Sequence, residues 1–134
     1  MSAHLRTRAA HMALAVVAVL VGLLVHGGRT GLGPLARDVV GDALWAAMIV
    51  GMVGATVPRA RVGRRGAMAL GICVAVELSQ LLHGPTIDAV RRTTFGELVL
   101  GSGFDPRDLA AYAVGVLAAT LLERLVVGRR RPRA

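Results

Sequence analysis

The sequence predicts an all-α integral membrane protein with four transmembrane helices and a short interfacial segment between the third and the fourth. Of its residues, 54% are apolar but only four are aromatic, and the apolar residues run in blocks of about 20, the length that crosses a bilayer. Short loops rich in arginine separate the blocks, as expected of loops that face lipid headgroups. The 134 residues are expected to form one transmembrane domain.

The first apolar block runs from about residue 9 to 27 and follows two arginines. A cleavable signal peptide is the alternative interpretation of such a block. Val25 and His26 are bulkier than the small residues preferred at a cleavage site, so a membrane span is favoured. Residues 28–34 follow as a glycine-rich turn, through which a helix does not easily continue.

The second and third blocks cover about 39–57 and 66–83, with a group of arginines between them. Glycines in both blocks are expected to allow close helix packing. Glu77 lies eleven residues into the third block, or about 16 Å along a helix that rises ~1.5 Å per residue. Gln80 is three residues further on, so it shares a helix face with Glu77.

Residues 86–103 are too polar to span the membrane, but apolar enough to lie on its surface as one or two short helices. Asp105 then predicts a helix N-cap, with Pro106 in the first helical position. The fourth predicted span covers about 108–127, and four arginines follow it.

The arginines also predict the orientation of the chain. With the N-terminus inside, the arginines before the first span, those at 59–65 and those after the fourth span all face the cytoplasm. The positive-inside rule thus predicts a multi-pass inner-membrane protein with both termini cytoplasmic. The formal charge of +8 is also typical of nucleic-acid binding, but these arginines flank apolar blocks instead of forming a basic face, so no nucleic-acid partner is expected.

Acidic residues gather on the predicted outer side. Asp38 and Asp42 begin the second span, and Asp105 and Asp108 begin the fourth. Negative charge is favourable at a helix N-terminus, so capping accounts for each of these residues taken singly. Their convergence around the buried Glu77 makes a functional cluster a stronger hypothesis than any one of them does.

Glu77 has two interpretations. An ionisable residue that faces lipid costs at least ~2.5 kcal/mol, so its presence in a span indicates a role with a substrate, an ion or a proton. Alternatively, Glu77 is protonated or paired with Arg37 and simply holds helices together. The sequence leaves both interpretations open.

No metal site, cofactor or nucleophile is indicated. The four histidines are scattered over both predicted sides without an i, i+4 pair. Cys73 stands alone in an apolar block and is expected to be a small buried hydrophobe. Ser79 and Ser102 have no oxyanion motif beside them. The residues therefore favour a binding protein over an enzyme.

Several residues follow an order and spacing that resemble a known pattern. In chain order they are Arg37, Gly41, Asp42, Glu77, Gln80, Gly101, Phe104, Asp105, Asp108, Leu109, Tyr112 and Gly115. This pattern resembles domain of unknown function 2809, a family of small bacterial membrane proteins that is distantly similar to the VanZ-like proteins. The resemblance implies a compact four-helix domain in the bacterial cell envelope and says little about activity.

The chain departs from the family pattern at two places. Pro106 stands where the family usually has Trp, which removes an interfacial anchor. Either Arg91 or Arg92 stands in for an arginine that the family carries before Gly101.

Together these residues predict an outward-facing polar cleft that binds a lipid-like envelope molecule or a membrane-protein partner, besides the lipid bilayer itself. One alternative is a membrane enzyme that acts on a lipid-linked substrate with Glu77 or Asp108 as general base. Another is a small transporter or accessory subunit in which Glu77 titrates. The residues expected to line the cleft are Arg37, Asp42, Glu77, Gln80, Asp105, Asp108 and Tyr112.

Overall fold

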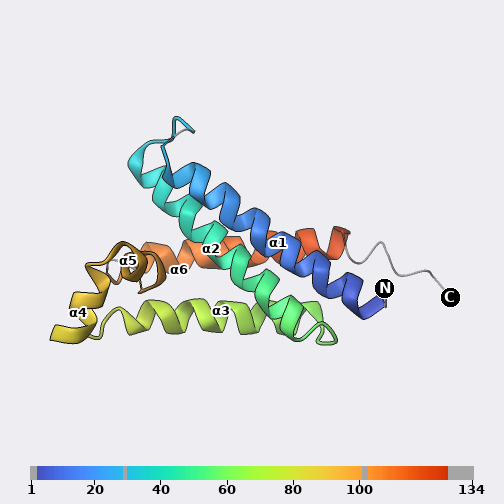
Figure 1. Ribbon diagram of the computed structural model, residues 1–134. Helices are drawn as coiled ribbons and strands as arrows, with labels where there is room; N and C mark the ends of the chain where they lie inside the picture. Colours follow the sequence, from blue (N-terminus) through green and yellow to red (C-terminus); the bar gives the residue numbers. More distant parts are fainter. Residues whose placement is uncertain (1–2, 29, 101–102, 127–134) are drawn as a thin grey trace.

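The computed structural model describes residues 3–28, 30–100 and 103–126, which form helices and contain no strand (Figure 1). The predicted all-α class is therefore confirmed for this part of the chain. Gly101, Ser102 and the arginines that follow the fourth predicted span lie outside the described residues. The helices are α1 (Ala3–His26), α2 (Pro34–Thr56), α3 (Val62–Ser79), α4 (Pro85–Arg91), α5 (Thr94–Leu100) and α6 (Pro106–Val126).

Helices α1, α2 and α6 are long and apolar enough to cross a membrane. They correspond to the first, second and fourth predicted spans, and each begins earlier than predicted. For α2 the reason is local. Pro34 occupies the first turn, where its missing N–H has no intrahelical partner to lose, and Gly33 precedes it as the N-cap.

Helix α3 covers most of the third predicted span, 66–83, but is not among the helices with a sufficiently apolar, weakly charged stretch of membrane-spanning length. It begins at Val62, ends at Ser79 and includes Arg64, Arg65 and Glu77 among its 18 residues. These three charges explain why composition alone does not mark α3 as a membrane helix. The described part of the chain thus has three helices suited to crossing a membrane, and the fourth span stays a prediction.

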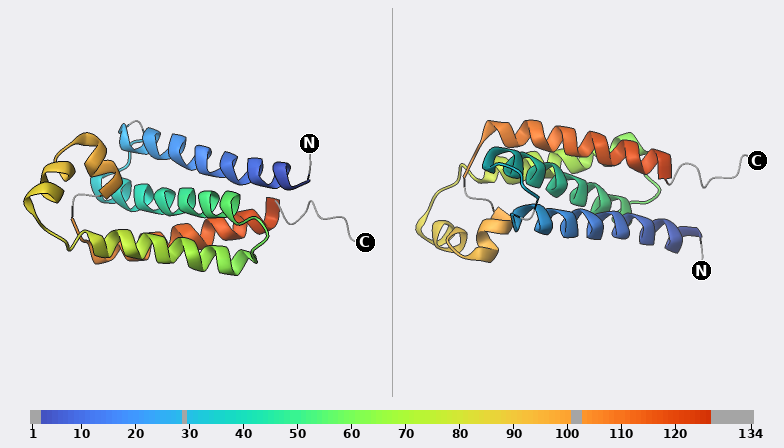
Figure 2. Two further views of the ribbon diagram at one scale, coloured as in Figure 1. Left: turned by 60° about the horizontal axis from the view of Figure 1, so that its bottom comes forward. Right: turned by 90° about the horizontal axis from the view of Figure 1, so that it is seen from above.

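Helix α2 is central to the bundle and contacts α1, α3 and α6 (Figure 2). Its fully buried Ala46 and Val50 meet Cys73 of α3 and Val116 of α6 in the core. The predicted burial of Cys73 is confirmed. Most core residues are small or medium-sized, which suits a bilayer, where helices associate through close packing because lipid tails are as apolar as leucine.

Glycine allows close approach between helices at several positions. A Cβ added at Gly51 or Gly54 of α2 would overlap atoms of α1, and one at Gly115 of α6 would overlap the carbonyl group of Ala43. A Cβ at Gly66 of α3 would lie 3.0 Å from Thr120 of α6, whereas one at Gly63 or Gly71 would meet nothing within 4 Å. The expected close packing is therefore confirmed for Gly51, Gly54 and Gly66 and wrong for Gly63 and Gly71.

The connection between α1 and α2 is the glycine-rich turn that the sequence predicts. Gly28 and Gly31 have φ angles of 71° and 67°, a left-handed conformation that residues with a Cβ rarely adopt. The segment between α3 and α6 forms two short helices, α4 and α5, as predicted. Their exposed Ile87, Val90 and Phe95 suit a membrane surface.

The bundle has two chemically different ends. We call one the basic end: it holds the start of α1, the α2–α3 turn and the end of α6 (Figure 1). We call the other the acidic end: it holds the α1–α2 turn, α4, α5 and the start of α6 (Figure 1). Both ends carry buried polar side chains.

Candidate functional site

Glu77 is the centre of the polar residues at the acidic end. Its side chain is fully buried, with 0% of its surface exposed. Oε1 accepts a hydrogen bond of 2.8 Å from the backbone N–H of Asp105. Oε2 accepts one of 3.1 Å from Nε2 of Gln80 and one of 3.2 Å from the hydroxyl of Tyr112. Four predicted site residues thus meet, and they join α3 to the start of α6.

The chain segment before α6 is held by the side chains of Glu77, in α3, and Gln80, the C-cap of α3. Oε1 of Gln80 accepts a 3.1 Å hydrogen bond from the backbone N–H of Gly103, beside the bond from Asp105 to Glu77. Asp105 also accepts a bond of 2.9 Å from the N–H of Arg107. The predicted N-cap at Asp105 is therefore confirmed, with Pro106 in the first helical position.

Asp42 of α2 and Asp108 of α6 lie beside this centre. Their carboxyl groups are close enough to each other and to Glu77 for electrostatic interaction. Unlike Glu77, both aspartates are partly exposed. We call Asp42, Glu77 and Asp108 the acidic cluster.

Capping is wrong as an account of Asp38 and Asp42. Since α2 begins at Pro34, both residues lie beyond its first turn, which contains no acidic residue. Capping does apply to Asp105, and Asp108 lies in the first turn of α6 as expected. Asp42 therefore has no local role at a helix end, and its neighbours are supplied by tertiary packing.

Arg37 does not pair with Glu77. Its Nη2 atom lies 3.4 Å from the backbone carbonyl oxygen of Leu32 and bonds to the α1–α2 connection instead. The paired interpretation of Glu77 is therefore wrong in this respect, since the three described hydrogen bonds of Glu77 come from neutral donors. Of the seven predicted cleft residues, Arg37 is the one that the fold directs elsewhere.

Arg91 has a defined role at the end of α3. Its guanidinium group donates to the carbonyl oxygens of Ser79, at 3.0 Å, and Leu82, at 2.9 Å. A cation is favourable there because the last carbonyl groups of a helix carry partial negative charge. Arg92, the other arginine considered for this place, is exposed.

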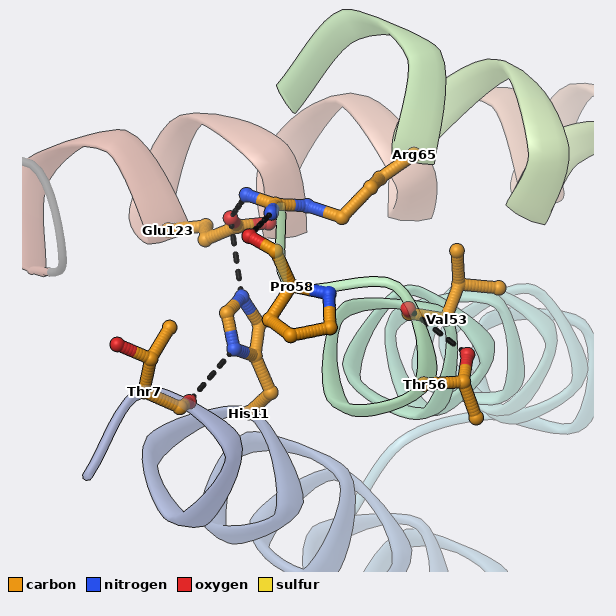
Figure 3. Close-up of polar contacts among 7 residues, drawn as sticks. All are labelled: Thr7, His11, Val53, Thr56, Pro58, Arg65 and Glu123. Atoms are coloured by element: carbon orange, nitrogen blue, oxygen red, sulfur yellow. Dashed lines mark hydrogen bonds and ion pairs between the residues drawn. The ribbon is translucent and has the colours of Figure 1, made fainter. Parts of the chain in front are cut away.

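A second polar cluster, which the sequence analysis missed, lies at the basic end (Figure 3). His11, Arg65 and Glu123 are 1%, 5% and 3% exposed. Oε1 of Glu123 lies 3.0 Å from Nε2 of His11 and also forms an ion pair with Arg65. Arg65 donates to the carbonyl of Pro58 at 2.9 Å, and Nδ1 of His11 donates to that of Thr7 at 2.7 Å.

This basic-end cluster of His11, Arg65 and Glu123 joins α1, α3 and α6. One signal in the sequence pointed to it: Glu123 is the single acidic residue on the predicted cytoplasmic side. Its histidine was interpreted as one of four scattered residues, and its arginine as part of a topology signal. Their meeting depends on Gly54, because the ring of His11 occupies the space that a Cβ at this position would need.

The chain matches a known protein family. Residues 33–116 match the family described as protein of unknown function (DUF2809). The chain belongs to this family. The DUF2809 match contains the whole acidic cluster and, of the basic-end cluster, only Arg65. No solved structure matches the chain.

Proposed function

We propose that this protein spans the bacterial inner membrane with four helices, both termini in the cytoplasm and the acidic end facing outward. The positions of the charged side chains in α3 are compatible with a membrane span. Arg65 and Glu77 are buried within the bundle and bonded there, so neither faces lipid. Arg64 is exposed but lies in the first turn, where a long side chain reaches the headgroups.

At the acidic end, the protein binds an amphiphile or a membrane partner that carries a cationic group, such as the amine of a lipid headgroup. The observation that carries this proposal is the convergence of three carboxyl groups from α2, α3 and α6. None of the described ion pairs joins any of the three to a basic side chain. An amine supplies the positive charge that the cluster lacks.

Within the acidic cluster, Asp42 and Asp108 contact the ligand, and Glu77 holds the helix that carries Asp108 in position. Asp42 and Asp108 are partly exposed, so they are the groups that contact the cation. Glu77 is buried and already accepts three hydrogen bonds. It orients the start of α6, and with it Asp108. The same burial argues against Glu77 as a general base or as a transporter's titrating group, since such a group must be reached by substrate or ion.

The second candidate is an enzyme that acts on a lipid-linked substrate. The closeness of Asp42 and Asp108 favours it, because two neighbouring carboxyl groups are able to supply an acid and a base side by side. Binding is preferred since it requires only the missing charge, whereas catalysis also requires a reacting group for which no residue at the acidic end has been identified.

The test compares lipid retention by the Asp42→Asn/Asp108→Asn variant with that by wild type. Proteins in nanodiscs of phosphatidylethanolamine and phosphatidylglycerol are transferred to detergent, and retained lipid is identified by native mass spectrometry. We expect the variant to retain about tenfold less phosphatidylethanolamine, because two charge-assisted hydrogen bonds are lost.

Glu97→Gln is the control, since Glu97 is an exposed acid of α5 at the same end. It is expected to retain lipid as wild type does. Equal retention by the Asn variant would disprove amine binding. The appearance of a chemically altered lipid with wild type, but not with Asp108→Asn, would favour the enzyme.

A further inference from the structure

A small pocket opens at the basic end, next to the His11, Arg65 and Glu123 cluster. Its volume is about 280 Å³, and it is lined by Leu5 and Arg8 of α1 and by Pro58 and Arg59 of the α2–α3 turn. It is slightly smaller than the ~300 Å³ at which pockets for whole drug-sized ligands begin. Its size therefore suits a headgroup, with the rest of a lipid remaining outside.

We propose that this pocket binds the phosphate group of an anionic lipid. Two arginines, Arg8 of α1 and Arg59 of the α2–α3 turn, line it, and no acidic residue is among its described lining residues. A guanidinium group matches the oxygens of a phosphate with two parallel hydrogen bonds, which makes arginine well suited to phosphate recognition. Leu5, which is 56% exposed, provides an apolar edge for the lipid backbone.

The buried cluster holds both walls of the pocket in place. Arg65 donates a hydrogen bond of 2.9 Å to the carbonyl oxygen of Pro58, which fixes the turn that carries Arg59. His11 lies one helical turn after Arg8 and contacts Glu123 of α6 at 3.0 Å. Since Glu123 also pairs with Arg65, one carboxylate links the α1 wall to the turn wall.

The depth of the pocket favours a lipid as the source of the phosphate. Leu5 begins the membrane-length segment of α1, and α2 ends at Thr56, two residues before Pro58. The pocket therefore lies where two apolar helices terminate at the same end of the bundle. In a membrane this is the headgroup layer, where the phosphates of anionic lipids are concentrated and attract arginine.

The experiment compares two double variants that remove the same charge at the same end. Arg8→Gln/Arg59→Gln removes the pocket arginines, and Arg61→Gln/Arg64→Gln removes two exposed arginines that do not line it. Each protein is placed in nanodiscs of phosphatidylglycerol and phosphatidylcholine, and retained lipid is measured by native mass spectrometry. Wild type is expected to retain phosphatidylglycerol selectively, and the pocket variant to retain about tenfold less.

The control variant is expected to retain nearly as much phosphatidylglycerol as wild type. An equal loss in both variants would overturn the proposal, because surface charge alone would then account for binding. Arg8→Lys/Arg59→Lys keeps the charge but removes the parallel N–H donors of the two guanidinium groups, so this variant should retain less phosphatidylglycerol than wild type. Retention equal to wild type would show that no shaped phosphate site exists.

A further arm distinguishes the source of the phosphate. Inorganic phosphate at millimolar concentration should not displace phosphatidylglycerol, since the acyl chains hold the headgroup at the pocket. If phosphate alone displaces the lipid, the lipid assignment is wrong and the pocket takes a soluble phosphate. This outcome is independent of amine binding at the acidic end, because the two tests use different variants and measure the retention of different lipids, phosphatidylethanolamine in one and phosphatidylglycerol in the other.

Discussion

Each end of the bundle buries a glutamate, but the partners of the two carboxyl groups differ in charge. At the basic end, Glu123 lies against Arg65 and His11, so its negative charge is compensated inside the protein. At the acidic end, Glu77 accepts hydrogen bonds from three neutral donors and lies near two further carboxyl groups. The charge of Glu123 is balanced within its cluster, whereas no described ion pair joins Asp42, Glu77 or Asp108 to a basic side chain.

This difference is the basis for proposing a structural role at the basic end and a binding role at the acidic end. A compensated and fully buried cluster has nothing to gain from a ligand at its carboxylate, and removing one partner leaves a charge exposed to an apolar interior. An uncompensated and partly exposed cluster gains from any cation that reaches it. The family match over residues 33–116 includes all of the acidic cluster but neither His11 nor Glu123.

The largest effect on stability is expected from breaking the compensated cluster. Glu123→Leu leaves Arg65 buried without its carboxylate, so the free energy of unfolding should fall by about 3–5 kcal/mol. Chemical unfolding in detergent measures this loss. The double variant Arg65→Met/Glu123→Leu removes both charges and should recover most of it. If the double variant is as unstable as the single one, buried charge is not the cause.

A smaller loss is expected from separating the helices that carry the acidic cluster. Gly115→Ala forces α6 away from the backbone of Ala43 in α2, next to Asp42, and over-packing of this kind costs about 1–3 kcal/mol. Gly41→Ala is the matched control, because a Cβ at Gly41 meets nothing within 4 Å. Thermal unfolding should rank Gly41→Ala at or above wild type and Gly115→Ala below it; the reverse ranking would contradict the described α2–α6 contact.

The smallest effect is expected at the uncompensated end. Glu77→Gln replaces one acceptor oxygen by an NH₂ group and so loses at least one of three hydrogen bonds. Interhelical hydrogen bonds in membranes contribute about 0.6–1.7 kcal/mol each, so the protein should fold with a modest loss of stability in a thermal unfolding assay. A loss as large as that of Glu123→Leu would show that both clusters are structural and would remove the contrast between the ends.

Local features of the sequence were sufficient to predict the helices. Apolar block length located α1, α2 and α6, and the prolines and glycines at 28–34 and 105–106 marked where helices end and begin. These signals are local because a helix closes its hydrogen bonds within a few residues of each position. The errors were local too: α2 begins at Pro34, and this one shift removed the capping role of Asp42.

The order of polar residues along the chain was enough to predict most of the acidic end. Glu77 and Gln80 share a face of one helix, and a family pattern connected them with Asp105, Asp108 and Tyr112. Only the tertiary structure decided which of these residues Glu77 bonds, and it excluded Arg37. A long flexible arginine reaches several neighbours from one backbone position, so its partner cannot be derived from spacing.

The basic-end cluster was decided by tertiary structure alone. Arg65 and Glu123 are 58 residues apart in the chain, and His11 reaches them only because Gly54 leaves room for its ring. Helix periodicity predicts which face of a helix a residue occupies, but it does not predict which helices pack together or how closely they approach. By itself, then, the sequence determined that one side of this protein is basic and the other acidic. The packing of α1, α3 and α6 around α2, and of α3 against α6, decided that the basic side also contains a buried carboxylate, with its charge compensated.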